Sequence, residues 1–125
     1  MRWAAFAILG LTLGAADPPA AYAQGSSAFD GTWTGTGTLV TRRGASCGPE
    51  TTDRRFTIEN GQITFPYDLR YGMSFSGPIQ ADGRFDLASG RNRFMGQATG
   101  SSMTATFSGA ECQRNFTFRR RAARQ

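Results

Sequence analysis

The residues of this chain that could do chemistry are arginines and two cysteines. All 14 basic residues are arginine, histidine is absent, and the 9 acidic residues leave a formal net charge of +5. Without histidine, the commonest general base and the commonest metal ligand are missing. Two cysteines alone cannot complete a zinc site, so we expect neither a metal nor another cofactor. No serine lies in a G-x-S-x-G motif and no two carboxylates are placed to converge, so we expect no catalytic residues and no enzyme.

Several arginines are candidates for binding an anion, because a guanidinium group binds a carboxylate or a phosphate through two parallel hydrogen bonds. The candidates are Arg42, Arg43, Arg54, Arg70, Arg93 and Arg114. Such a set favours an anionic glycan, a lipid headgroup or an acidic protein as the partner. Basic charge with aromatic residues also suits nucleic acid, but the expected export argues against that partner. The alternative interpretation is that these arginines pair with nearby carboxylates and are otherwise solvated.

Residues 1–23 have the features of a secretory signal peptide. Arg2 precedes an apolar run that is too short to span a bilayer, and the Ala-Tyr-Ala sequence at 21–23 is a small-x-small cleavage motif. We therefore expect export to the periplasm or the medium of a chain that begins at Gln24 and has no transmembrane segment. The absence of lysine is typical of a GC-rich genome, which indicates a bacterial source.

Residues 31–41 form the clearest predicted strand. Its threonines alternate with Trp33, two glycines and Leu39, which is the period of two that the pleat of a strand imposes. The threonine face suits solvent, because branched side chains fit a pleated surface and keep their hydroxyls hydrated. Trp33 is expected to be a buried structural anchor, with the glycines making room for large side chains from across a narrow core.

Seven more short strands are predicted, and no stretch has a helical period over a useful length. They lie at 54–59, 62–67 and 71–80, and then around Phe85, Phe94, Met103 and Phe116. Asn60-Gly61 is the strongest hairpin signal, because a type I′ turn needs positive φ at both central residues. We expect an all-β fold, a single eight-stranded antiparallel up-and-down barrel over residues 31–121. A mobile N-terminal lead at 24–30 and a basic tail at 122–125 would flank this domain.

The two cysteines test the closure of that barrel. Cys47 follows the first predicted strand, and Cys112 opens the last one. If these two strands pair in antiparallel fashion, the two cysteines are neighbours. In an exported protein the default is one disulfide, so the sequence predicts a Cys47–Cys112 bond that closes the barrel between its first and last strands.

The same topology gathers positive charge at one end of the barrel. In a meander, the connections that follow the first, third, fifth and seventh strands, here called the odd-numbered connections, all lie at the same end. This end collects eight arginines against four carboxylates: Arg42, Arg43, Arg54, Arg55, Arg70, Arg91, Arg93 and Arg114 against Glu50, Asp53, Asp68 and Glu111. Arg54 and Arg114 share the parity of the inward-facing residues, so we expect them at the mouth. Two interpretations of the aromatic residues stay open, namely that they fill the interior or that they line a cavity for an apolar ligand.

The tripeptide Gly31-Thr32-Trp33 in the first strand resembles the G-x-W signature of the calycin barrels, the lipocalin and avidin group. The resemblance implies that a basic residue of the last strand lies over the tryptophan, and Arg119, Arg120 or Arg121 is similarly placed. In that family these residues have a structural role. The tryptophan-lined biotin pocket of avidins is not expected, because only one tryptophan follows the signal peptide. The chain is also shorter than a typical lipocalin.

We therefore expect a non-catalytic exported barrel that binds a small ligand or an anionic partner at its arginine-rich end. The alternative is a small secreted inhibitor of a hydrolase that acts through its N-terminal segment or its loops. In outline the chain looks like the compact, disulfide-bearing barrels among bacterial protease and lysozyme inhibitors.

Overall fold

The structure, a computed structural model, describes residues 25–42 and 47–121. The expected signal peptide, Gln24, Arg43 and the expected tail at 122–125 lie outside these residues. Within them the chain forms eight strands and two single-turn 3-10 helices, η1 (Ser27–Phe29) and η3 (Leu69–Tyr71). The strands are β1 (Gly31–Arg42), β2 (Thr51–Glu59), β3 (Gln62–Asp68), β4 (Met73–Pro78), β5 (Arg84–Ser89), β6 (Asn92–Thr99), β7 (Ser102–Ser108) and β8 (Cys112–Arg120).

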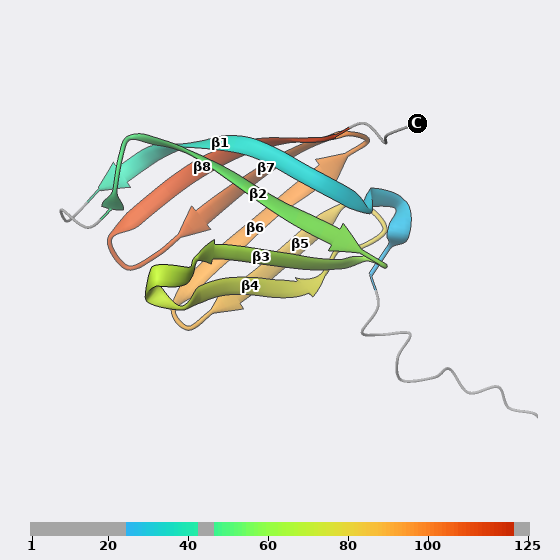
Figure 1. Cartoon of the computed structure of the whole chain (residues 1–125), viewed down its shortest axis with the longest axis horizontal. Helices are drawn as coiled ribbons and strands as arrows, with labels where there is room; N and C mark the ends of the chain where they lie inside the picture. Colours follow the sequence, from blue (N-terminus) through green and yellow to red (C-terminus); the bar gives the residue numbers. More distant parts are fainter. Residues whose placement is uncertain (1–24, 43–46, 122–125) are drawn as a thin grey trace, which may run out of the picture.

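The strands form one antiparallel sheet that curls into a nearly closed barrel (Figure 1). The order in the sheet is β4-β3-β2-β1-β8-β7-β6-β5, so consecutive strands pair except for β4 and β5, and β1 pairs with β8. The alternation of outward polar and inward apolar residues sets this register, because a slip of one residue would expose the whole apolar set. The predicted eight-stranded up-and-down barrel is confirmed.

The first and last strands join the two halves of the sheet. β1 and β8 pair from Trp33 opposite Arg120 to Arg42 opposite Cys112, with one irregularity near Val40. The Cys47–Cys112 disulfide ties the connection after β1 to the start of β8, which confirms the predicted bond. The edges of the sheet are instead β4 and β5. These edges lie close together, because a Cβ added at Gly77 would come within 2.5 Å of Leu87 Cδ2.

Aromatic side chains fill the barrel. Six phenylalanines are at most 2 % exposed and pack mostly edge-on or tilted against one another: Phe56, Phe65, Phe75, Phe94, Phe116 and Phe118. Such edge-on and offset contacts are the favourable arrangements for aromatic quadrupoles. The structure therefore supports the interpretation that these residues fill the interior.

Gly35 and Gly37 of β1 make room for two of these rings. A Cβ added at Gly37 would lie 2.3 Å from Phe116, and one added at Gly35 would lie 2.7 Å from Phe118. The rings belong to β8, the hydrogen-bonded neighbour of β1. The glycines therefore accept side chains from the adjacent strand, and not from across the core as the alternation in β1 led us to expect.

Five boundaries of the first four strands differ from the predicted ones, and two of them are the ends of β3 at Asp68 and of β4 at Pro78, which were predicted at residues 67 and 80. β2 begins at Thr51 and not at residue 54, because residues 51–53 continue the ladder with β1 and Thr36 donates a hydrogen bond of 2.7 Å to the Asp53 carboxylate. β4 begins at Met73 and not at residue 71, because η3 interrupts the chain after β3. β1 extends to Arg42.

The segment at 25–30, which we expected to be mobile, packs against the barrel. The Ser26 amide donates to the Ile79 carbonyl at 2.8 Å, and Phe29 is buried. The Asp30 carboxylate accepts hydrogen bonds from the amides of Asn60 and Gly61, at 2.8 and 3.0 Å. The segment thus satisfies backbone donors of the β2–β3 turn, and a polar lead becomes an ordered cover for one end of the barrel.

Candidate functional site

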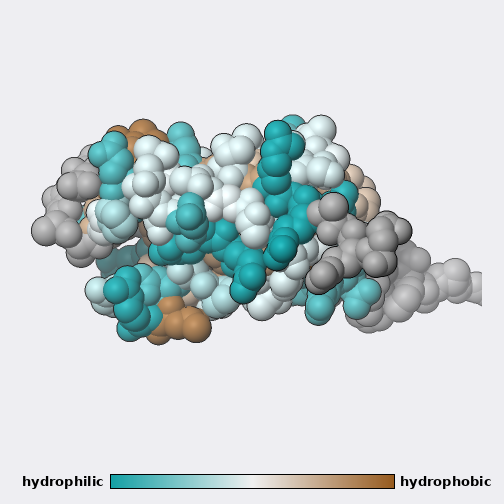
Figure 2. All heavy atoms as spheres, turned by 45° about the horizontal axis from the view of Figure 1, so that its top comes forward, coloured by the Kyte–Doolittle hydropathy of each residue, from teal (hydrophilic) through white to brown (hydrophobic). Residues whose placement is uncertain are grey.

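The four odd-numbered connections meet at the other end of the barrel, where three of them surround a pocket of about 580 Å³. The pocket is open to solvent, and Figure 2 shows a recess at this end of the molecule. Its lining comes from the β1–β2, β3–β4 and β7–β8 connections and from the strand residues just inside them, with Asn92 from the start of β6. The topology alone brings these segments together, since no two of the three connections are close in sequence.

One wall of the pocket is apolar. It is formed by Tyr67, Tyr71, Met73 and Phe107. The rings of Tyr67 and Phe107 are stacked, with centroids 4.4 Å apart and planes inclined by 10°. Tyr67 is nearly buried, whereas Tyr71 is 72 % exposed and stands at the rim. The wall therefore offers flat aromatic surface from the interior out to solvent.

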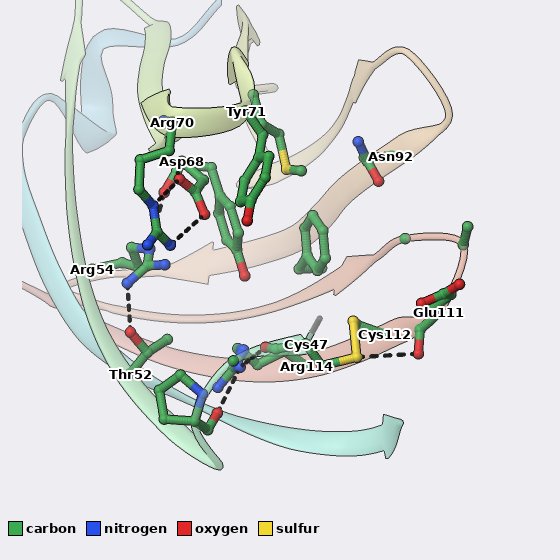
Figure 3. A pocket seen from close by; sticks show the side chains of 17 residues that line it. Cys47, Thr52, Arg54, Asp68, Arg70, Tyr71, Asn92, Glu111, Cys112 and Arg114 are labelled. Carbon is green, nitrogen blue, oxygen red and sulfur yellow. Dashed lines mark hydrogen bonds and ion pairs between the residues drawn. A yellow bond between two sulfur atoms is a disulfide. The ribbon is translucent and has the colours of Figure 1, made fainter. Parts of the chain in front are cut away.

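Asp68 and Arg70 hold the connection between β3 and β4 in shape. The Asp68 carboxylate accepts hydrogen bonds from the Arg70 amide at 3.2 Å and from Nε and Nη2 of the same residue, both at 3.1 Å (Figure 3). The hydrogen bond from the Arg70 side chain lowers the pKa of Asp68. Arg70 lines the pocket, but its guanidinium is already engaged with this carboxylate.

Arg54 of β2 also lines the pocket and retains a donor. Its Nε donates to the Tyr67 carbonyl at 3.1 Å, and its Nη1 donates to Thr52 Oγ1 and to the Asp53 carbonyl. The guanidinium lies over the Tyr67 ring, 5.0 Å from its centroid. Among the residues that the structure describes, no hydrogen bond uses Nη2 of Arg54. The side chain is thus held in place by three contacts while one of its nitrogens stays available to a ligand.

Arg114 of β8 has a different role, although it faces inward like Arg54. It is 3 % exposed, and its Nη1 donates to the carbonyls of Gly37 and Glu50, both at 3.1 Å. Its Nη2 donates to the carbonyls of Cys47 and Pro49, at 3.0 and 2.8 Å. Each terminal nitrogen therefore uses both of its hydrogens. Arg114 anchors the connection at 47–50, which forms one wall of the pocket.

The two inward arginines also act on the Tyr67 hydroxyl. Burial raises the pKa of Tyr67, and the nearby charges of Arg114 and Arg54 counteract part of that rise. The hydroxyl therefore stays protonated at neutral pH and keeps a proton that it can donate.

Replacing Arg114 with methionine is expected to lower the free energy of unfolding by about 2 kcal/mol, because four carbonyl groups lose their donor. Water at the mouth can hydrate some of these groups, so the loss is smaller than for a fully buried site. Urea denaturation measures it. Arg55→Met is the matched control, because Arg55 is exposed on the outer face of β2 and its replacement should change stability by less than about 0.5 kcal/mol. Equal midpoints for both variants would contradict the structural role of Arg114.

Not all of the candidate arginines reach this pocket. Arg93 pairs with Asp86 across the β5–β6 ladder, and both side chains are half-exposed on the outer wall. Arg42 belongs to β1, but its side chain is not among those described, and Arg43 lies outside the described residues. Of the six arginines, the structure brings Arg54, Arg70 and Arg114 together in the pocket.

Sequence reasoning did not single out Tyr71, Met73, Asn92 or Thr52 as site residues, yet all four line the pocket. Their places beside the same odd-numbered connections were the available signal. Tyr71 was the clearest signal of a site among these four residues. A connection such as 68–72 is expected to carry small and polar residues, so an aromatic residue there stands out.

Trp33 lies away from the pocket, toward the end of the barrel that η1 covers. It is fully buried, and its indole nitrogen donates to the Phe29 carbonyl at 2.9 Å. The guanidinium of Arg120 lies over the ring, 5.5 Å from the centroid, and its Nη1 donates to the carbonyls of Ala28 and Asp30. These contacts are structural, since they hold the start of β1 against the end of β8.

Within residues 25–42 and 47–121, no three His, Cys, Asp or Glu side chains are grouped so that they could hold a metal ion. Among these residues, no helix is both long enough and apolar enough to cross a membrane. No protein-family model matches the chain, and no curated protein or solved structure is significantly similar to it.

Proposed function

We propose that this protein is an exported, non-catalytic binding protein that holds a small amphipathic anion in the pocket at the loop end of the barrel. The observation that carries the proposal is the position of Arg54. Its guanidinium is fixed over the Tyr67 ring with Nη2 available, directly beside an apolar wall. A ligand with a ring or a short alkyl chain and one carboxylate, sulfonate or phosphate group fits this combination.

The size and the composition of the pocket support a small ligand. Pockets for small molecules commonly enclose about 300–1,000 Å³ and combine apolar walls with a few polar groups, and this one measures about 580 Å³. Because phenylalanines fill the barrel below it, the ligand would rest at the mouth instead of deep inside. The anionic group would accept from Arg54, and the Tyr67 hydroxyl is a further donor.

The location outside the cytoplasm is part of the same proposal. A disulfide such as Cys47–Cys112 persists in an oxidising compartment, and the pattern at 1–23 is that of a secretory signal peptide. The calycin resemblance is compatible with a ligand at the mouth of a barrel, but the proposal does not depend on it.

The inhibitor alternative requires an N-terminal segment that is free to enter a partner's active site. Residues 25–30 instead pack against the barrel through Phe29 and through the Asp30 carboxylate. They also lie at the end opposite the pocket (Figure 1). This packing favours a binding protein over an inhibitor that acts through its N-terminus.

Arg54→Gln is expected to weaken the binding of an aromatic sulfonate by about tenfold, which corresponds to about 1.4 kcal/mol. This is the size expected for the loss of one charge-assisted hydrogen bond. The probe is 1-anilinonaphthalene-8-sulfonate, titrated by its fluorescence. The uncharged N-phenyl-1-naphthylamine has the same rings without the sulfonate, so it should bind the parent more weakly and should lose little in the variant.

Arg55→Gln is the matched control, because Arg55 is the next residue along β2 but faces outward and does not line the pocket. It should bind the sulfonate like the parent. Thermal melts of all three proteins exclude loosening of the fold as the cause, since loosened folds also change dye binding. If Arg54→Gln and Arg55→Gln lose the same affinity, or if the uncharged dye binds as tightly as the sulfonate, the proposed site is wrong.

A further inference from the structure

The exposed apolar side chains of this protein are concentrated at the pocket end. Within the described residues, the large hydrophobic side chains left exposed are Val40 at 55 %, Leu69 and Tyr71 at 72 % each, and Met95 at 39 %. Leu69 and Tyr71 form η3 at the rim, and Val40 lies near the end of β1 that leads to the same rim. Figure 2 shows hydrophobic patches near the recessed end of the molecule. Only Met95 lies elsewhere, on the outer wall of β6.

The turn η3, which carries Leu69 and Tyr71, is capped at both ends. Asp68 caps the turn by accepting from the Arg70 amide, and Gly72 ends it in the left-handed conformation with φ of 65°. Arg70 is exposed between the two apolar residues and lies over the Tyr71 ring, 5.6 Å from its centroid. The sequence Leu-Arg-Tyr thus lies on one short exposed turn. Leucine is an aliphatic anchor, and arginine and tyrosine are residue types that occupy the boundary between the headgroups and the acyl chains of a lipid bilayer.

Positive charge lies at the same end. Arg91, in the connection between β5 and β6, is exposed, and no residue of the described chain hydrogen-bonds to it or pairs with it. Arg70 is also exposed at this end, although its guanidinium pairs with the Asp68 carboxylate. Arginines near an anionic bilayer are attracted by its surface potential, and the attraction weakens with salt.

We propose that the pocket end docks onto an anionic phospholipid bilayer, with Leu69 and Tyr71 entering the interfacial region and Arg91 facing the headgroups. The bilayer is favoured over a protein partner because Leu69 and Tyr71 are each 72 % exposed on a single turn with Arg70 between them, and the described residues add only Val40 to the large exposed apolar side chains at this end. This inference goes beyond ligand binding in the pocket, because Leu69 and Arg91 do not line the pocket. Docking in this orientation would place the pocket mouth against the membrane surface.

Tyr71→Trp provides a direct reporter of docking. Trp33 is fully buried, so the signal of the introduced indole is the difference between this variant and the parent. With vesicles of equal parts phosphatidylglycerol and phosphatidylcholine, its emission should shift to shorter wavelength, and brominated lipid should quench it. Vesicles of phosphatidylcholine alone, or high salt, should reduce both effects.

Co-sedimentation with the same vesicles separates the contributions of the apolar residues and of the arginines to membrane binding. Leu69→Ser should weaken binding by about tenfold, because an aliphatic anchor is lost, and Arg91→Gln should weaken it by about fivefold. The matched controls are Met95→Ser, which removes an exposed apolar side chain from the outer wall, and Arg119→Gln, which removes an exposed arginine of β8. Both controls should bind like the parent.

Several outcomes would overturn docking at this end. They are an absence of vesicle binding at low salt, equal losses from Arg91→Gln and Arg119→Gln, and a Tyr71→Trp signal that appears without lipid as the protein self-associates. Failure here is distinguishable from failure of the proposed pocket. Leu69→Ser should leave the binding of the aromatic sulfonate unchanged, whereas Arg54→Gln should weaken sulfonate binding and leave vesicle binding largely intact.

Discussion

Replacing Trp33 with alanine is expected to lower the free energy of unfolding by about 3–5 kcal/mol. The side chain is fully buried, so its removal leaves a cavity at the junction of β1 and β8. The Phe29 carbonyl loses the indole donor, and the Arg120 guanidinium loses the ring below it. A domain of this size commonly has only 5–15 kcal/mol of stability, so the variant should be partly or largely unfolded at 37 °C.

Thermal denaturation followed by circular dichroism measures this effect, since 1 kcal/mol shifts the melting temperature of such a domain by about 4–8 °C. Trp33→Phe is the matched control. It keeps most of the buried apolar volume and removes the indole donor, so it should cost only about 1–2 kcal/mol. If Trp33→Ala melts within about 2 °C of the parent, Trp33 does not anchor the barrel.

Removal of the disulfide is expected to have an effect of similar size. The double variant Cys47→Ala with Cys112→Ala should lose about 4 kcal/mol, because the bond closes a loop with a sequence separation of 65 residues and restricts the unfolded chain. The folded state should change little. The ladder between β1 and β8 and the hydrogen bonds from Arg114 to the carbonyls of Cys47 and Pro49 hold the same segments together.

Urea denaturation of the parent with and without reductant, and of the double variant, tests this expectation. The reduced parent and the double variant should share a lower midpoint with an increased exposed surface on unfolding, and hence a steeper denaturant dependence. Peptide mapping without reductant should recover Cys47 linked to Cys112. A midpoint that does not respond to reductant would show that the cross-link contributes nothing to stability.

The local pattern of residues determined the fold class and the order of the strands. Alternation with a period of two marks each strand, and Asn60-Gly61 adopts the positive φ values, 53° and 76°, that a tight hairpin turn needs. Short connections favour the pairing of consecutive strands, so most of the meander follows from sequence alone. The exception is β4 and β5, which remain the two edges of the sheet. The two cysteines then identified the one pairing that is distant in sequence, between β1 and β8. The strands and turns are predictable because they depend on neighbours in the chain, and the one distant pairing is predictable because the two cysteines mark it.

The ends of the elements were less predictable, because distant partners decide them. β2 begins at Thr51 because its first residues continue the hydrogen-bonded ladder with β1. From the sequence alone this stretch is rich in polar residues and is therefore predicted to be a loop. Phe29 and Asp30 belong to the fold because the barrel offers a site for the ring and two unpaired amides for the carboxylate. Nothing in the composition of the segment reveals those partners.

At the site, the two inward-facing arginines show most clearly which features the sequence determines and which the tertiary structure decides. Their parity on β2 and β8 placed Arg54 and Arg114 at the mouth, and the topology identified the end of the barrel where the pocket lies. Only the tertiary structure distinguishes their roles. Carbonyls from the connection at 47–50 converge on Arg114 and use its donors, whereas Arg54 is fixed by Tyr67 and Thr52 with one nitrogen left for a ligand. The strand pattern sets the direction of a side chain, but its hydrogen-bond partners come from segments that only folding brings together.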